Sequence, residues 1–233
     1  MPGSYKIIVR NHTGGTQNYS FFSAPPTVSG ASSGKVWSAI MKSSRNVPNG
    51  ASVSFEFSSN YYAFCGSSQG SLQHGSSISI SKTMPVTLGH KQGSGVELGS
   101  TVNLVVYEGS YADLAPPNDS GHGKVGNFQL DTSCQPGSQF TIQDARDNNL
   151  LVGVATARDG DMSIPIGAFN PYPNAKYQIM PQSTYFVACG DRFEAGQVVQ
   201  PEMIGNTIAV DFNARGTNNV TLIHNDSMQY EFA

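Results

Sequence analysis

The pattern of apolar and polar positions along the chain predicts strands. Residues 52–57 (SVSFEF) and 77–81 (SISIS) alternate between the two classes, which places every second side chain on the same face of a strand. Residues 102–107 (VNLVVY) and 207–212 (TIAVDF) are rich in the β-branched and aromatic side chains that strands favour. No segment longer than about two turns shows the apolar period of an amphipathic helix. We therefore predict an all-β fold, and specifically an antiparallel β-sandwich.

Four sequence blocks occur twice along the chain in the same order, which is typical of an internal duplication. The clearest pair is 61–66 (YYAFCG) with 185–190 (YFVACG), and the other pairs are 48–53 with 173–177, 75–80 with 205–210, and 86–90 with 220–224. We predict a first β-rich repeat over 1–107 and a second over 126–233, joined by a connecting loop over 108–125. The repeats are expected to form one compact body with pseudo-two-fold symmetry, in which Cys65 superposes on Cys189 and His90 on His224.

Each repeat is expected to open with a β-hairpin. In the first repeat, strands at 5–10 and 17–22 flank a turn at 11–15, and in the second, strands at 139–143 and 150–152 flank a turn at 144–149. Both turn segments contain several Asn, Asp or Gly residues, which tolerate the positive φ angles of tight hairpin turns.

Composition favours a globular β protein and indicates no nucleic-acid partner. Only 12% of the 233 residues are charged and 10% are aromatic, which is the opposite of a disordered chain. The 13 Lys and Arg residues are scattered and the net charge is −3, so the chain has no basic patch for phosphate binding.

The apolar runs and the cysteines indicate in which compartment the protein is expected to occur. The first residues show no signal-peptide pattern, and no apolar run is long enough for a transmembrane segment. Cys65, Cys134 and Cys189 are odd in number and widely spaced, which is neither a disulfide framework nor a zinc pattern. We therefore expect a cytoplasmic protein with three free thiols, with no metal and no cofactor.

Two sets of residues leave alternatives open. Cys65 and Cys189 could act as nucleophiles beside His90 and His224, or could be small buried side chains. The acidic turns at 144–149 and 158–161 offer carboxylates of the kind that bind calcium. Asp and Asn are also ordinary turn residues, however, and the spacing of a calcium loop is absent.

The connecting loop holds the candidate binding residues. It mixes aromatic and hydrogen-bonding side chains, and long loops in compact domains are often functional. If the protein is an enzyme, His122 with Asp119 or Asp113 would supply the acid and the base. The segment could equally be a plain linker. The ligand-binding candidates are Tyr107, Tyr111, Asp113, Asn118, Asp119 and His122.

Short motifs carry two resemblances to known families. Residues 7–11 (IIVRN), 13–19 (TGGTQNY) and 24–26 (APP), with 176–179 (KYQI), resemble a family of small β-rich proteins found mainly in fungi. We attach no activity to that family, and it transfers no site residues. Residues 188–192 (ACGDR) with Gly196 are similar to aegerolysins, which implies a lipid-binding β-sandwich.

These features favour a non-enzymatic, lectin-like protein that binds carbohydrate on the loops of a rigid β scaffold. The expected partner is a glycan or another small molecule, such as a lipid head group, and duplication would give two sites. The alternative is a small cofactor-independent enzyme of the isomerase or cyclase type, acting on an apolar metabolite in a pocket between the repeats. A structural or storage role without a ligand, and assembly into a homo-oligomer, also stay open.

Overall fold

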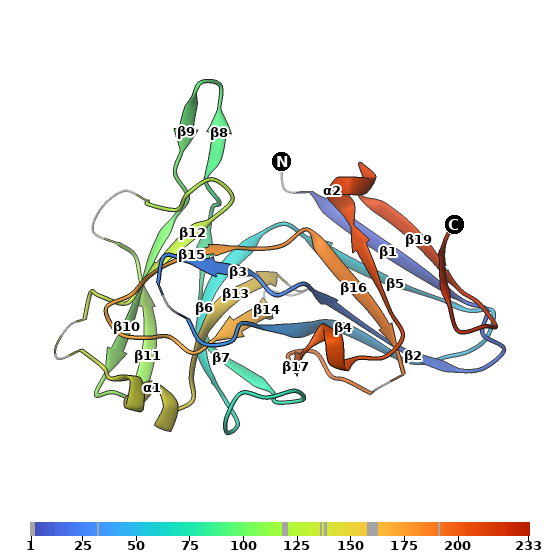
Figure 1. Cartoon of the computed structure of the whole chain (residues 1–233), viewed down its shortest axis with the longest axis horizontal. Helices are drawn as coiled ribbons and strands as arrows, with labels where there is room; N and C mark the ends of the chain where they lie inside the picture. The colour runs from blue at the N-terminus through green and yellow to red at the C-terminus, as the bar shows by residue number, and fades with distance from the viewer. Residues whose placement is uncertain are drawn as a thin grey trace.

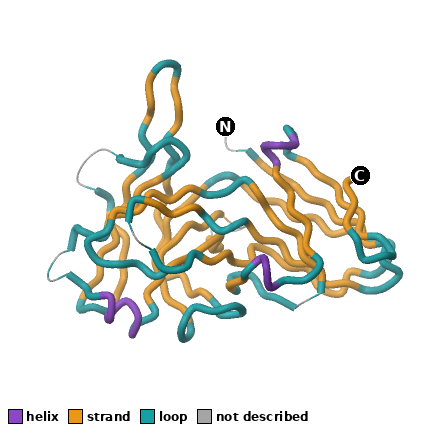
Figure 2. The backbone as a smooth tube through the Cα atoms, viewed as in Figure 1, coloured by secondary structure: helices purple, strands orange, loops and turns teal. Residues whose placement is uncertain are grey.

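The fold is built almost entirely from β-strands. The computed structural model describes residues 3–31, 33–117, 121–135, 137, 139–157, 163–190 and 192–233, and their strands form several largely antiparallel sheets (Figure 1, Figure 2). Helical structure in these residues is limited to α1 (Ile142–Asp147), α2 (Phe212–Arg215) and the short 3-10 helix η1 (Pro201–Met203). The predicted all-β sandwich is confirmed. No helix among the described residues has the length and apolar character needed to cross a membrane.

A large central sheet runs through the molecule. Both of its faces are buried, because neighbouring residues such as Phe21 and Phe22 enter different apolar clusters. The nearly continuous burial of two central strands fits this environment. In spatial order the strands are β18 (Thr207–Asp211), β16 (Thr184–Cys189), β2 (Gln17–Ser23), β4 (Trp37–Val47), β14 (Ser163–Phe169), β13 (Leu150–Ala157), β6 (Tyr61–Ser68) and β7 (Ile78–Val86), and β17 (Val198–Val199) pairs with β4.

Two smaller sheets lie at opposite ends of the central sheet (Figure 1). The β1 sheet has the order β20 (Tyr230–Phe232), β19 (Asn219–His224), β1 (Ser4–Asn11) and β5 (Ser52–Ser58). The β10 sheet has the order β11 (Tyr111–Ala115), β10 (Thr101–Tyr107), β12 (Phe128–Asp131), β15 (Lys176–Met180) and β3 (Thr27–Ser29). Aromatic contacts mark both interfaces. Phe21 stacks on Phe55 with ring centroids 5.4 Å apart, and Phe169 meets Tyr177 at 5.0 Å.

Alternation along β10 decides which of its side chains can meet a ligand. Val102 and Leu104 point into the core and are almost fully buried. Thr101, Asn103 and Tyr107 take the alternate positions and therefore lie on the outer face of the β10 sheet.

A two-stranded ribbon projects beside this sheet (Figure 1). It consists of β8 (His90–Gln92) and β9 (Gly95–Glu97), whose residues are all exposed. His90 and Glu97 lie opposite each other, with Nε2 3.5 Å from Oε2.

Strand pairing repeats in a two-fold pattern. The parallel pair β1–β19 corresponds to β12–β10, and the antiparallel pair β2–β16 corresponds to β13–β6, while β4 and β14 meet at the centre. The correspondence holds along the chain: eight strands of the first part make the same pairings, in the same order, as eight strands of the second part. The first set is β1, β2, β4, β5, β6, β7, β10 and β11, and the second is β12, β13, β14, β15, β16, β18, β19 and β20. Two intertwined repeats would produce this pattern, and the duplication itself stays a prediction.

The pairing pattern corrects one of the four matched blocks. Cys65 on β6 and Cys189 on β16 occupy corresponding places. His224 ends β19, whose counterpart is β10, whereas His90 begins the projecting ribbon, so the expected superposition of these histidines is wrong. By strand pairing, β19 corresponds to β10 at 101–107, and the Val-Thr-Leu match at 86–88 precedes that strand.

The expected hairpin at the start of the chain is wrong. β1 pairs with β5 and β19, and β2 pairs with β4 and β16, so the segment 11–15 connects two sheets. The buried Asn11 side chain fixes this connection by donating to the carbonyl oxygens of Gly15 and Val47, at 2.8 and 2.9 Å. A buried amide needs such partners, and a local hairpin would not bring Val47 to it.

The expected hairpin at 139–152 is replaced by helix α1. Thr141 Oγ1 accepts from the Asp144 amide at 3.0 Å, and the Asp144 carboxylate accepts from the Thr141 amide at 2.7 Å. This reciprocal capping box begins the helix, and here it outweighs the turn preference of the Asp and Asn residues that follow.

The expected connecting loop is not a loop throughout. Tyr111–Ala115 forms β11, which pairs with β10 through a turn at 108–110. Ala112 and Leu114 are buried in the core, and this alternation was overlooked beside the loop-forming prolines at 116 and 117.

Candidate functional site

Two exposed tyrosines face each other across the turn that joins β10 to β11. Tyr107 and Tyr111 are a cross-strand pair with ring centroids 6.1 Å apart and an interplanar angle of 35°. Their side chains are 44% and 61% exposed, respectively. An exposed aromatic pair offers ring faces to a ligand, because its apolar surface is not used by the core. We call this hairpin end, residues 107–111, the tyrosine turn.

The backbone of the tyrosine turn is firmly held. Glu108 has a φ of 51° and Gly109 a φ of 70°, and two consecutive positive φ angles are typical of the primed turns that join antiparallel strands. The Asn148 side chain at the end of α1 donates to the Gly109 carbonyl at 3.1 Å. A Cβ atom at Gly109 would lie 3.1 Å from the carboxyl carbon of Asp144, so the turn packs closely against α1.

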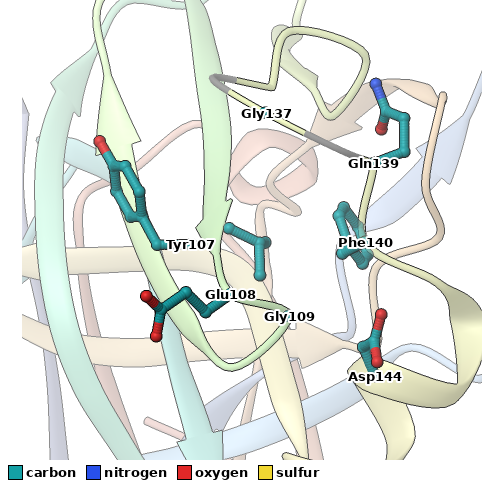
Figure 3. Close-up of a pocket in the computed structure, with 8 residues that line it drawn as sticks. Tyr107, Glu108, Gly109, Gly137, Gln139, Phe140 and Asp144 are labelled. Atoms are coloured by element: carbon teal, nitrogen blue, oxygen red, sulfur yellow. The ribbon is translucent and has the colours of Figure 1, made fainter.

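A pocket of about 520 Å³ opens beside the tyrosine turn (Figure 3). One wall comes from the end of β10 and the turn, and the other from α1 and the segment ahead of it. Tyr107 lies at the rim with its ring directed away from Phe140, which forms part of the opposite wall. Concave sites with aromatic and polar lining are the usual form of ligand pockets. The lining residues are Val106, Tyr107, Glu108, Gly109, Gly137, Gln139, Phe140 and Asp144.

One wall of this pocket contains a buried acceptor. Gln139 donates through Nε2 to the Ser133 carbonyl at 2.9 Å, while its Oε1 is buried and has no hydrogen-bond partner among the described residues. Leaving a buried polar atom unsatisfied costs about 1–3 kcal/mol, so such atoms are usually met by water or by a ligand. Gln139 Oε1 has almost no accessible surface, so the side chain would have to turn before this atom could accept from a ligand.

Asp144 adds a carboxylate to the same pocket. Hydrogen bonds from the Thr141 amide and hydroxyl lower the pKa of Asp144, so this group is ionised near neutral pH. An ionised carboxylate accepts hydrogen bonds and donates none. Asp144 is thus a carboxylate acceptor in the lining of the pocket.

Asp113 lies on the outer side of β11 and is bound by Lys82 of β7. The Lys82 Nζ atom is 2.6 Å from Asp113 Oδ1, which also accepts from the Leu114 amide at 2.7 Å. The hydrogen bond from Lys82 lowers the pKa of Asp113. In turn, Asp113 raises the pKa of Lys82, with a smaller contribution from the nearby Tyr111 phenol. Tyr111, Asp113 and Lys82 therefore form one polar surface next to the tyrosine turn.

The structure separates His122 from the tyrosine turn. The His122 amide donates to Thr101 Oγ1 at 2.8 Å, at the far end of β10. The strand between Thr101 and Tyr107 spans roughly 20 Å. His122 lines a smaller pocket together with Asp131 and Cys134. Of the six predicted binding residues, Tyr107, Tyr111 and Asp113 lie together, His122 lies apart, and Asn118 and Asp119 fall outside the described residues.

Comparison with protein-family models matches the chain to RhiA over residues 2–231, which is nearly its whole length. The chain belongs to the RhiA family. The RhiA description states no function, so it assigns no role to the tyrosine turn or to any other site. The comparison with curated proteins found no match, and neither did the comparison with solved structures. A fungal source and a likeness to aegerolysins are not part of the RhiA match and stay predictions, as does a cytoplasmic location.

The buried cysteines of this RhiA-family chain are poor nucleophiles near neutral pH. Burial raises the pKa of Cys65 and of Cys189 to about 11. The Cys65 thiol donates to the Ala112 carbonyl at 3.5 Å and the Cys189 thiol to Gln17 Oε1 at 3.1 Å. Within the described ranges, no hydrogen bond joins a cysteine to a histidine in either expected repeat. The geometry therefore favours the alternative in which both are small buried side chains.

The corresponding turn of the β1 sheet lacks an exposed tyrosine pair. Tyr230 begins β20 as Tyr111 begins β11, but its ring stacks on His224 with centroids 4.3 Å apart. The Tyr19 hydroxyl lies 3.0 Å from His224 Nδ1, and burial lowers the pKa of this histidine. His224 is thus a neutral core residue, and the Tyr230 ring is packed against it.

The acidic turns do not gather into a metal site in the part of the chain that the structure describes. Asp144 caps α1, and residues 158–161 lie outside the described ranges. No group of three or more His, Cys, Asp or Glu side chains suited to a metal occurs among the described residues.

Sequence reasoning missed the wall of the pocket that faces the tyrosine turn. The sequence predicts a strand at 139–143, which includes Gln139 and Phe140. Gln135 explains their position, because it accepts from the Val106 amide and donates to the Leu104 carbonyl, both at 2.8 Å. Where β10 no longer pairs with β12, the Gln135 side chain hydrogen-bonds to the free backbone groups of β10. It thereby holds the following segment beside the tyrosine turn. The Thr-x-x-Asp capping box was the one sequence signal that could have located α1.

Proposed function

We propose that this RhiA-family protein is a non-enzymatic carbohydrate-binding protein whose ligand occupies the pocket beside the tyrosine turn. The proposal depends chiefly on the exposed Tyr107–Tyr111 pair, whose ring centroids are 6.1 Å apart and of which Tyr107 lines that pocket. A sugar ring presents an apolar C–H face and a rim of hydroxyl groups. Aromatic rings with polar neighbours match both features.

The polar groups around the tyrosines suit hydroxyl ligands. The Asp144 carboxylate is an acceptor in the pocket, and the Lys82–Asp113 pair lies beside Tyr111 on the outer side. Neutral hydroxyl groups can donate to these acceptors without the large desolvation cost of a charged ligand.

The firm backbone of the tyrosine turn also supports a binding role. Glu108 and Gly109 hold positive φ angles, and the contact with Asn148 fixes the turn against α1 before a ligand arrives. A preorganised site loses less conformational entropy on binding, so more of the contact energy appears as affinity.

The same residues give less support to the enzyme alternative. An isomerase or cyclase without a cofactor needs an acid and a base in one pocket. A hydrogen bond from Lys82 lowers the pKa of Asp113, and hydrogen bonds from Thr141 lower the pKa of Asp144, which makes both carboxyl groups poor proton donors near neutral pH. His122, the third predicted member, lines another pocket.

A glycan array probed with the wild-type protein and with Tyr111→Ala tests the proposal. The wild type should bind a subset of glycans, and Tyr111→Ala should weaken that binding about fivefold or more, because removal of a central aromatic contact can cost more than about 1 kcal/mol. The melting temperature should hardly change, since the Tyr111 side chain is 61% exposed.

Phe232→Ala is a matched control. Phe232 is an aromatic residue, 39% exposed, on the corresponding strand β20 of the β1 sheet, where it lies against Arg215. This variant should bind glycans as the wild type does. Equal binding by Tyr111→Ala and the wild type, or no glycan binding by the wild type, would contradict the proposal.

A further inference from the structure

The β10 sheet carries a row of buried polar side chains on its outer face. Thr101 and Asn103 of β10 pair with Gln129 and Asp131 of β12. Their exposures are 5%, 7%, 6% and 5%. Buried polar groups destabilise a fold unless they find partners, and each of these has one: the His122 amide for Thr101, the Pro116 carbonyl for Asn103, Gln178 for Gln129, and Lys176 for Asp131. The row is therefore held in a fixed arrangement.

A pocket of about 230 Å³ lies against this row. His122, Cys134 and Lys176 complete its lining on the other sides. The backbone at His122 is tied to the sheet, because its amide donates to Thr101 Oγ1 at 2.8 Å and its carbonyl accepts from Gln178 at 3.1 Å. This wall of the cavity is therefore fixed to the sheet.

The charges that face this pocket cancel. Asp131 Oδ2 lies 3.4 Å from Lys176 Nζ, and Asp131 Oδ1 accepts from the Ser133 amide at 2.8 Å. Asn103 Nδ2 donates to the Pro116 carbonyl at 3.4 Å and Gln129 Oε1 accepts from Gln178 Nε2 at 3.0 Å, so the other groups of these amides are the Asn103 oxygen, an acceptor, and the Gln129 nitrogen, a donor. Such a set matches neutral hydroxyl groups, which donate and accept, better than it matches an ion.

We propose that this pocket is a second ligand site, which takes one neutral polyhydroxylated molecule of the size of a single sugar ring. Its volume of about 230 Å³ is below the roughly 300 Å³ at which pockets for drug-sized ligands begin, so the ligand is small. The site goes beyond the function proposed for the tyrosine turn and does not depend on it, because the two lie roughly 20 Å apart along β10.

Cys134 provides a direct reporter of occupancy. It is exposed and lines this pocket, whereas Cys65 and Cys189 are buried. A ligand in the pocket covers the thiol, so binding should slow the reaction of Cys134 with a thiol-reactive dye in the folded protein.

The experiment measures the labelling rate of Cys134 while glucose, galactose and N-acetylglucosamine are titrated separately. At a concentration about ten times the half-protecting value, a sugar that binds should slow labelling about tenfold, by mass action. Serine, a zwitterion of similar polarity, should not protect. If none of the three sugars protects Cys134, or if serine alone does, the inference is wrong.

Variants of two lysines test whether the protection of Cys134 comes from this pocket. Lys176→Met should raise the half-protecting concentration about tenfold, because a hydrogen bond to a charged group contributes about 1.5 kcal/mol or more. The Lys176 side chain is 63% exposed, so the fold should persist. Lys91→Met, in the exposed projecting ribbon, is the matched control and should leave protection unchanged. Equal protection in Lys176→Met and the wild type would overturn the assignment. The glycan array tests the site at the tyrosine turn, and the labelling rate of Cys134 tests the second pocket. Failure of one proposal can therefore be told apart from failure of the other.

Discussion

Single side chains decide how much of the tyrosine turn is available to a ligand. Lys82 binds Asp113 at 2.6 Å, and the Thr141 amide binds Asp144 at 2.7 Å. Gln139 retains one buried acceptor without a partner among the described residues. The groups left for a ligand are therefore few and identifiable: two tyrosine rings and the remaining lone pairs of Asp144.

The three cysteines should differ in reactivity. Cys134 is exposed, whereas burial raises the pKa of Cys65 and Cys189 to about 11. A thiol reagent at about pH 8 should modify Cys134 alone in the native protein, and all three cysteines after unfolding without reductant, because the thiolate is the reactive form. Mass spectrometry of the labelled protein counts the modified thiols. A disulfide, or a second thiol that reacts quickly in the native state, would show this prediction to be wrong.

The same burial predicts how stability depends on pH. The pKa of each buried thiol is raised from its ordinary value of 9.0 to about 11. In the unfolded chain these thiols ionise first, so their contribution to stability is complete below pH 9.0 and is lost as the pH rises toward about 11. In denaturant unfolding, Cys65→Ala should show a smaller loss over this range than the wild type. If Cys65→Ala loses as much stability as the wild type over this pH range, the raised pKa of the buried thiol does not account for the loss.

At the scale of elements, the candidate site depends on the meeting of a strand end, a turn and a helix start. Gln135 holds the segment ahead of α1 along the free edge of β10, with hydrogen bonds of 2.8 Å to Val106 and Leu104. Asn148, at the other end of α1, binds Gly109 at 3.1 Å. Movement of any of these elements would change the distance between the tyrosine turn and Phe140.

Gly109→Ala should disturb the turn and the pocket together. The positive φ of 70° should cost about 1–2 kcal/mol of folding free energy with an alanine, and the new Cβ would lie 3.1 Å from the Asp144 carboxyl carbon. Glycan binding should weaken, because the turn that carries Tyr107 and Tyr111 must shift. Thermal unfolding and glycan titration measure the two effects.

Gly93→Ala controls for backbone strain alone. Gly93 has a φ of 60°, and a Cβ atom there would meet nothing within 4 Å. This variant should lose stability but keep full glycan binding. If both variants bind equally well, contact between the turn and α1 does not position the tyrosines.

The sequence predicted strands more reliably than their partners. Alternation at 52–57 and the β-branched and aromatic residues at 102–107 correctly predict β5 and β10, and the grouping of Tyr107, Tyr111 and Asp113 survives in the structure. Strand pairing was harder, because the turn residues at 11–15 do not reveal that the flanking strands belong to different sheets. The role of Gln135 was also hidden, since only the folded chain shows which backbone groups of β10 lack a strand partner.

At the scale of the whole molecule, strand pairing follows a two-fold pattern but the candidate binding features do not. The β10–β11 and β19–β20 turns occupy corresponding places. Tyr111 is exposed in the first, whereas Tyr230 in the second stacks on His224. We therefore expect one tyrosine site per chain, and any multivalent binding would require assembly of several chains.

Nuclear magnetic resonance with isotope-labelled tyrosine rings tests this central claim most directly. The chain has 10 tyrosines, which serve as probes throughout the molecule. We predict that a glycan selected on the array shifts the resonances of Tyr107 and Tyr111, assigned with Tyr→Phe variants, and leaves those of Tyr19 and Tyr230 unchanged. A bound glycan that leaves Tyr107 and Tyr111 unshifted, or that shifts Tyr230 equally, would contradict a single carbohydrate site at the tyrosine turn.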